Sequence, residues 1–229
     1  MKKANPKAML LFGCKSGIGF EILKLSESYG FNVVGISKNR LNQEFSNPKA
    51  FLQCDLGVIE NLSKIKEFLK KNKLKFDVCI YNTGYAVAGD ILQLQEKDIL
   101  KMVNVNYTMP LLIIKSLMNE NVLKKNSKII YVSTTAIEKQ IPEISMYAKN
   151  KKMFEEVIKT HINVFERNRG VRLIIVRLGA VNTNFGVNFS LNVRENMKNG
   201  LSPQKVAKYV LNIAKGRLGN ELTEICIKK

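Results

Sequence analysis

Short hydrophobic runs alternate along the chain with longer segments in which apolar residues recur with the period of a helix. Continuous apolar runs are typical of strands buried on both faces, whereas the helical period is typical of segments that bury one face. The runs predict strands at residues 8–12, 31–36, 50–54, 76–81, 128–133 and 171–177. Because strands and helices alternate, the pattern favours an α/β fold in which a doubly wound parallel sheet carries helices on both faces.

Two of the predicted helices lie between these strands in the first half of the chain. One covers residues 58–72, and the other runs from about residue 96 to residue 122 with one break. The second carries Asn104 and Asn106 among apolar residues. A buried side-chain amide needs a hydrogen-bond partner, so we expect these residues to bend or hydrate the helix.

A glycine-rich turn follows the first predicted strand and opens the first helix. Its sequence is Gly13-Cys14-Lys15-Ser16-Gly17-Ile18-Gly19. Glycines permit positive φ and a close approach of the backbone to a pyrophosphate, and the free N–H groups of a helix N-terminus attract the same anion. The turn therefore indicates dinucleotide binding, with a purely structural turn as the alternative.

The residues at the end of the second strand indicate which dinucleotide is bound. An acidic residue there would bind the ribose 2′-OH of NAD and repel the 2′-phosphate of NADP. The chain instead has Ser37 and Lys38, with Arg40 close by and Lys15 and Ser16 in the glycine turn. A hydroxyl and several cations suit a phosphate, although a merely polar exit from the strand would have the same composition.

A tyrosine and a lysine four residues apart are the candidate reactive groups. Tyr147 and Lys151 lie on one face of a helix that we predict to continue to Gly170. A cation near a phenol lowers its pKa and makes it a usable acid or base near neutrality. Thr134 ends the preceding strand thirteen residues before Tyr147, at the sheet edge where catalytic groups collect. Alone, the pair would also fit a packed tyrosine beside a solvated lysine.

Composition limits the alternatives. The 229 residues are 45% hydrophobic with a formal net charge of +18, but the basic residues are mostly lysines spread along the chain, and no nucleic-acid-binding signature accompanies them. No apolar run approaches the length of a membrane span, so we expect a cytoplasmic protein without nucleic-acid or membrane partners. We expect His161 to be structural or solvent-facing. The cysteines lack the close spacing of a zinc site, and we expect reduced, mostly buried thiols at Cys14, Cys54, Cys79 and Cys226.

Taken together, these motifs resemble the compact short-chain dehydrogenase/reductases over nearly the whole chain. Gly13, Gly17 and Gly19 are similar to the family's glycine turn, and Tyr147 with Lys151 to its Tyr-x-x-x-Lys pair. Further resemblances lie in Asp55, Asn82-Thr83-Gly84, Asn106 and Leu178-Gly179-Ala180-Val181-Asn182-Thr183. The resemblance implies a single domain over residues 1–229 with a Rossmann-type sheet of about seven parallel strands.

The resemblance also implies NADP(H) along the carboxyl edge of the sheet, without a metal. The implied cofactor-binding residues are Gly13, Lys15, Ser16, Gly17, Ile18, Gly19, Ser37, Lys38, Asp55, Leu56, Asn82, Gly84, Tyr147, Lys151, Gly179, Val181 and Thr183.

The implied catalytic residues are Asn106, Thr134, Tyr147 and Lys151. In this scheme Thr134, with Ser133 beside it, orients a carbonyl, Tyr147 gives the proton, and Lys151 lowers the pKa of Tyr147 and holds the nicotinamide ribose. Asn106 supports a water chain that resupplies the proton. The chain departs from the family pattern in two places, because Thr134 replaces a serine and Leu178 replaces a proline.

The implied function is hydride transfer between NADP(H) and a small carbonyl or alcohol substrate. Residues 185–201 are the expected substrate lid, and pairing of the helices at residues 107–122 and 144–168 implies a homodimer or homotetramer. The alternative is a catalytically weak NADP(H)-sensing or scaffolding protein on the same fold.

Overall fold

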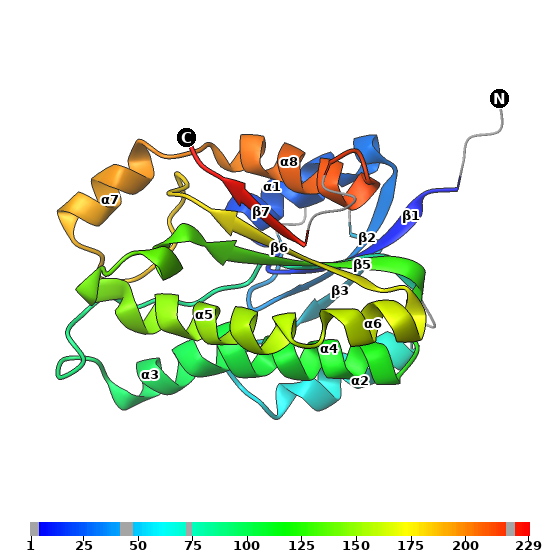
Figure 1. Cartoon of the computed structure of the whole chain (residues 1–229), viewed down its shortest axis with the longest axis horizontal. Coiled ribbons are helices and arrows are strands. Elements are labelled where there is room, and N and C mark those ends of the chain that lie inside the picture. The colour runs from blue at the N-terminus through cyan, green and yellow to red at the C-terminus, as the bar shows by residue number, and fades with distance from the viewer. Residues whose placement is uncertain (1–4, 42–47, 72–74, 219–222) are drawn as a thin grey trace.

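The computed structural model describes residues 5–41, 48–71, 75–218 and 223–229, and within these ranges seven parallel strands form one sheet (Figure 1). The strand order is β3-β2-β1-β4-β5-β6-β7. The strands are β1 (Lys7–Phe12), β2 (Phe31–Ser37), β3 (Ala50–Gln53), β4 (Phe76–Tyr81), β5 (Leu123–Thr134), β6 (Arg172–Leu178) and β7 (Glu224–Ile227). This arrangement confirms the predicted doubly wound α/β fold.

Helices cover both faces of the sheet (Figure 1). One layer contains α1 (Gly17–Ser26) and α8 (Pro203–Lys215), and the other contains α2 (Asn61–Lys71), α4 (Met109–Asn119) and α5 (Ser145–Lys159). The other helical segments are η1 (Glu27–Tyr29), α3 (Glu96–Val103), the π-helical η2 (Asn104–Thr108), η3 (Thr135–Glu138), η4 (Pro142–Ile144), α6 (Ile162–Arg169) and α7 (Leu191–Lys198).

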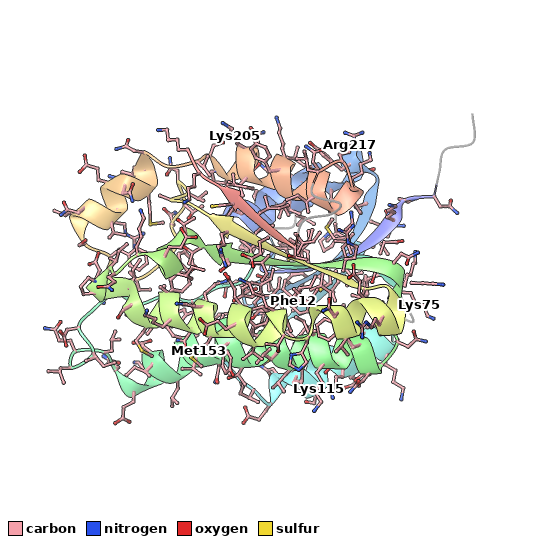
Figure 2. All side chains as sticks on the ribbon, in the orientation of Figure 1. Phe12, Lys75, Lys115, Met153, Lys205 and Arg217 are labelled. Carbon is pink, nitrogen blue, oxygen red and sulfur yellow. The ribbon has the colours of Figure 1, made fainter. Side chains whose placement is uncertain are left out.

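The continuous apolar runs of the central strands follow from these two layers. Successive residues of a strand point to opposite faces, so a strand covered on both sides is apolar at every position. Leu10 and Phe12 pack with α2, α4 and α5, whereas Met9 and Leu11 pack with α1 and α8. Figure 2 shows Phe12 in the interior, while exposed basic side chains such as Lys115 project at the periphery.

The predicted helix over residues 96–122 is interrupted by η2. Asn104 and Asn106 both lie in this π-helical turn, where the two amides predicted a disturbance. The hydroxyls of Tyr81 and Tyr131 donate to the carbonyl oxygens of Val105 and Asn106, at 2.7 and 2.9 Å. These two bonds satisfy buried backbone groups of the irregular turn.

Two predicted helix boundaries are wrong. The helix that carries Tyr147 does not continue to Gly170, because a turn at residues 160–161 separates α5 from α6. The hydroxyl of Thr160 donates to the Val157 carbonyl (2.7 Å), a local bond that competes with helix continuation. Helix α2 begins at Asn61 rather than at residue 58, since the preceding residues form turns stabilised by Asp55.

The parallel arrangement brings the carboxyl ends of all seven strands to one edge, at the left of Figure 1. The loops that follow β1 to β6 therefore meet there, together with α7. None of the helices in the described ranges is long and apolar enough to cross a membrane.

Candidate active site

The glycine turn after β1 has a geometry that other residues would not reproduce. Gly13 and Gly17 have φ values of 81° and 55°, in the left-handed region that favours glycine. A Cβ at Gly19 would collide with the Gly13 carbonyl oxygen and lie 2.7 Å from the Asn82 amide nitrogen. The side chain of Ser16 does not cap α1. The first turn of α1 therefore presents backbone N–H groups suited to an anion.

A cleft of about 580 Å³ extends from this turn along the ends of β2, β3 and β4. Its size and donors fit a dinucleotide, because the N–H groups of α1 would face the pyrophosphate and buried polar groups lie beside them. The hydroxyl of Thr83, for example, is buried and has no hydrogen-bond partner among the described residues. The cleft includes most of the predicted cofactor residues, namely Gly13, Lys15, Ser16, Gly17, Ile18, Ser37, Lys38, Asp55, Leu56, Asn82, Gly84 and Thr183.

Asp55 is the centre of a charged cluster at one end of the cleft. Its Oδ2 lies 3.1 Å from the Lys38 ammonium and 3.4 Å from the Lys101 ammonium. Its Oδ1 accepts a hydrogen bond from the Gly57 N–H at 2.9 Å. Burial by itself would raise the pKa of Asp55, but the Gly57 amide and the two ammonium groups outweigh it and hold that pKa below its usual value.

Lys101 is a cleft residue that the sequence did not indicate. It lies on α3, and its ammonium is 4.8 Å from the centre of the Tyr85 ring. In sequence Lys101 is 46 residues from Asp55 and is one of many lysines, so neither spacing nor composition distinguishes it. Its position in the cleft is visible only in the folded chain.

A smaller cavity of about 190 Å³ adjoins the cleft and contains the predicted reactive groups. Tyr147, Lys151 and Thr134 all line it, and the first two are almost completely buried. The Lys151 ammonium donates to the Val132 carbonyl at 2.7 Å. It also lies 4.5 Å from the centre of the Tyr131 ring and 5.9 Å from that of Tyr147.

Burial shifts the pKa values of Tyr147 and Lys151. The shift of Tyr147 is opposite in direction to the prediction. Desolvation raises the pKa of Tyr147, where the sequence predicted that Lys151 would lower it. Lys151 is buried as well, and desolvation lowers its pKa to about 7 against a smaller opposing effect of Glu155. The lysine is therefore only partly protonated at neutral pH, and its charge does not offset the burial of the phenol.

Thr134 and Asn106 make bonds that define what each group can do. The Thr134 hydroxyl accepts the Ala136 N–H at 3.1 Å and keeps its own proton for another acceptor. The Asn106 side chain donates to the carbonyls of Tyr85 and Met102 and accepts the Tyr85 N–H. Asn106 lines neither cavity, so it supports the site from behind.

Some of the remaining predicted site residues line a cavity, and one supports the glycine turn without lining a cavity. Gly179 and Val181 line the smaller cavity, and Ile18, Asn82, Gly84 and Thr183 line both. Gly19 lines neither, because it packs against Gly13.

The predicted lid at residues 185–201 comprises a loop and α7. Val187 pairs with residues 86–88, giving and receiving backbone hydrogen bonds of 2.9 Å. The Arg194 guanidinium donates to the carbonyls of Phe185 and Gly186, at 2.9 and 2.7 Å. Phe185 lines both cavities, with its ring centre 5.3 Å from that of Tyr147.

The thiols and the single histidine take no part in this geometry as reactive groups. Cys14, Cys54 and Cys79 are buried and free, and burial raises the pKa of Cys14 to about 11. Cys226 is exposed, as is His161. In the described part of the chain, no three His, Cys, Asp or Glu side chains are grouped so as to hold a metal ion.

Comparison with known proteins assigns the chain to a class. A family model described as short chain dehydrogenase matches residues 7–193. The chain therefore belongs to the short-chain dehydrogenase family of oxidoreductases.

Among curated proteins, the uncharacterized oxidoreductase C162.03 of Schizosaccharomyces pombe is 24% identical over 185 residues, which are 79% of this chain. This chain spans only 63% of that protein. The 3-oxoacyl-(acyl-carrier-protein) reductase FabG of Buchnera aphidicola is 22% identical over 233 residues, 98% of this chain and 90% of the relative.

Solved structures agree on the fold. 4-Hydroxyisoleucine dehydrogenase complexed with NADH has a TM-score of 0.84 at 18% identity, covering 97% of both chains. BdcA in complex with NADPH has a TM-score of 0.81 at 19% identity, covering 96% of this chain and 92% of the other. Nicotinamide cofactors of both kinds thus occur among the structural neighbours.

The buried lysine predicts a pH-dependent stability. The pKa of Lys151 falls from the ordinary 10.5 to about 7 on folding, so between these values the unfolded chain binds more protons than the folded one. The free energy of unfolding should therefore rise with pH in this window, by at most about 1.4 kcal/mol per pH unit from this group. Denaturant unfolding of wild type and Lys151→Met at pH 7 and pH 9 measures the effect.

The free energy of unfolding of the wild type, minus that of Lys151→Met, should increase from pH 7 to pH 9. Lys149→Met, an exposed position on the same helix, should show no such increase. If the difference in unfolding free energy between the wild type and Lys151→Met stays constant with pH, the lowered pKa of Lys151 is contradicted.

Proposed function

We propose that this protein is an NADP(H)-dependent oxidoreductase that interconverts a carbonyl and an alcohol. The observation that carries the proposal is the burial of Tyr147 and Lys151 in a small cavity that opens into a dinucleotide-sized cleft. Ile18, Asn82, Gly84, Thr183 and Phe185 belong to both spaces. A cofactor held in the cleft would therefore reach the substrate cavity beside Tyr147.

The chain's own groups have distinct roles in this reaction. The Tyr147 phenol is protonated at neutral pH, which is the form that can give a proton to a carbonyl oxygen, and burial raises its pKa so that it is a weaker acid than a free phenol. Thr134 directs its free hydroxyl proton toward the same oxygen and orients it. Lys151 has N–H donors beyond the one that Val132 accepts, and these would hold the nicotinamide ribose. The bound nicotinamide supplies the hydride.

The cleft residues hold the cofactor in this scheme. The glycine turn at residues 13–19 and the N-terminus of α1 would bind the pyrophosphate, and Asp55 and Leu56 would receive the adenine. The Asn106 side chain is held by Tyr85 and Met102, and its backbone carbonyl accepts the Tyr131 hydroxyl. From behind the site, Asn106 would support a water chain that returns the proton.

The preference for NADP(H) rests on the cations at the adenosine end. Lys38 is more than half exposed and is paired only through its tip with Asp55, so it can turn toward a phosphate. Ser37 and Lys15 line the same cleft, and Lys101 remains beside Asp55 when Lys38 turns away. We also place the protein in the cytoplasm, as its composition predicts.

A homodimer or homotetramer is part of the proposal. The outer face of α5 and α6 exposes Met153, Val157 and Val164, with 43%, 37% and 47% of their surfaces accessible. Apolar side chains repeated along one face would be covered by a second copy of these helices.

Cofactor affinity is the first test of the proposal. We expect the protein to bind NADPH at least about tenfold more tightly than NADH, a difference of about 1.4 kcal/mol, because cations and a hydroxyl replace the acid that would select NAD. Fluorescence titration with both cofactors measures the ratio. Lys38→Asp should move the preference toward NADH, and equal affinities in the wild type would reject the assignment.

The proton donor is tested by Tyr147→Phe. Loss of one hydroxyl leaves the ring packing intact but should lower turnover by at least about 100-fold, within the range that general acid catalysis contributes. NADPH affinity should barely change. Lys151→Met should impair both turnover and binding, while Thr134→Ala should reduce turnover and Thr134→Ser preserve it. Full activity of Tyr147→Phe on a substrate found by screening ketones, aldehydes, sugars and acyl thioesters would discard this mechanism.

Assembly is measured by sedimentation at micromolar concentration. The expected result is a species of twice or four times the 26.0 kDa chain mass. Val157→Lys on the exposed face of α5 should shift it toward the single chain, because a charge at an interface core is costly. A wild-type protein that sediments only as one chain would refute the assembly.

A further inference from the structure

Much of the wall of the smaller cavity is apolar. The apolar lining residues belong to the segment after β5, to the lid loop and to α7. They are Ala136, Ile141, Ile144, Phe185, Phe189, Val193 and Met197. The ring centres of Phe185 and Phe189 are 6.3 Å apart with the planes nearly perpendicular. Phe189 packs in one cluster with Ile144 and Ala136. A ligand in this cavity therefore meets hydrocarbon on this side and the polar groups of Thr134, Tyr147 and Lys151 on the other.

The charges on the wall have one sign. Among the residues that line the cavity, Lys139 and Lys151 are basic, and none is Asp or Glu. Lys139 is exposed, which places it at the mouth, and it has no ion-pair partner in the described part of the chain. Its neighbour Glu138 is already engaged by Arg177 at 3.6 Å and Lys228 at 3.5 Å. An anionic group at the mouth would find an unpaired cation there, and a cationic group would find no carboxylate among the lining residues.

The volume limits the size of the apolar part. The cavity measures about 190 Å³ and opens to the larger cleft at Ile18 and Thr183, which line both spaces. An apolar cavity of roughly 150 Å³ admits a benzene ring. With a nicotinamide ring held on the cleft side of Ile18 and Thr183, the cavity would suit one ring or a short branched chain, and any further group would be directed to the mouth.

We propose that the substrate is a compact apolar carbonyl compound that carries one anionic group. Its hydrocarbon part packs against Phe185 and Phe189, its carbonyl oxygen meets Tyr147 and Thr134, and its anion pairs with Lys139. The inference rests on the proposed function, since it concerns the same cavity. Reduction adds hydride to the carbonyl carbon and the Tyr147 proton to its oxygen, and the anionic group does not change.

The test uses para-substituted acetophenones, which share the ring and the ketone and differ in one group. With NADPH, we expect kcat/KM to be highest for 4-acetylbenzoate, lower for the uncharged 4-methyl compound and lowest for the 4-trimethylammonium compound. Lys139→Gln should lower kcat/KM for 4-acetylbenzoate about three- to fivefold, through KM, because an exposed ion pair contributes little more than that. The same change should leave the 4-methyl compound unaffected.

Controls separate a specific contact from loss of overall charge. Lys208→Gln removes an exposed lysine of α8, outside the cavity, and should leave all three ketones unchanged. 4-Acetylbiphenyl should be reduced at least about tenfold more slowly than the one-ring ketone if the cavity limits size.

The outcomes distinguish this inference from the function on which it rests. Equal kcat/KM for the three charges, or an equal effect of Lys139→Gln on all of them, would overturn the inference while the enzyme stands. So would turnover confined to polar sugars or to cationic carbonyl compounds. Absence of NADPH oxidation with every carbonyl compound tested would instead overturn the proposed function and this inference with it.

Discussion

The burial of one lysine constrains the rest of the site. Lys151 is only 2% exposed, and an ammonium in that position is stable only with partners that replace water. The Val132 carbonyl accepts one of its protons, and the face of the Tyr131 ring lies 4.5 Å from its nitrogen. Each partner belongs to β5, so the strand end and α5 must keep their relative positions for the lysine to remain buried. Tyr147, one turn earlier, is thereby fixed as well.

The same contacts continue into the irregular turn on the other side of Tyr131. Its hydroxyl donates to the Asn106 carbonyl, and its ring stacks on Phe154 of α5 with centres 3.9 Å apart. Asn106 in turn anchors Tyr85 through both atoms of its amide. A continuous set of bonds therefore joins the lysine, the sheet, the π-helical turn and the wall of the cleft. The turn is less regular than a helix, yet two of its buried carbonyls accept the hydroxyls of Tyr81 and Tyr131, which belong to the central strands β4 and β5.

The features that the sequence could predict are those determined within one strand, turn or helix. Strands, the glycine turn and the pairing of Tyr147 with Lys151 depend on period, backbone freedom and spacing within one element, and the structure has each of them. The place of Lys101 in the cleft and the stacking of Tyr131 on Phe154 depend on neighbours distant in sequence. The end of α5 before Thr160 depends on one local hydrogen bond, and the hydrophobic period reveals none of these features. The acidity of Tyr147 belongs to the second group. The spacing predicted that the Lys151 cation would lower the pKa of Tyr147, whereas burial of both groups raises that pKa.

The lid loop couples the two cavities, because Phe185 is a wall of both. Its ring touches the Tyr147 side of the smaller cavity, and its backbone is tied by Arg194 to α7, which carries other residues of that cavity. Val187, two residues later, pairs with the strand-like segment after Gly84. A displacement of this loop that widens the cleft must therefore also move α7 and reshape the smaller cavity. In the proposed function, cofactor entry and substrate fit would therefore depend on one segment, because the hydrogen bonds of Val187 and Arg194 hold the wall that both cavities share.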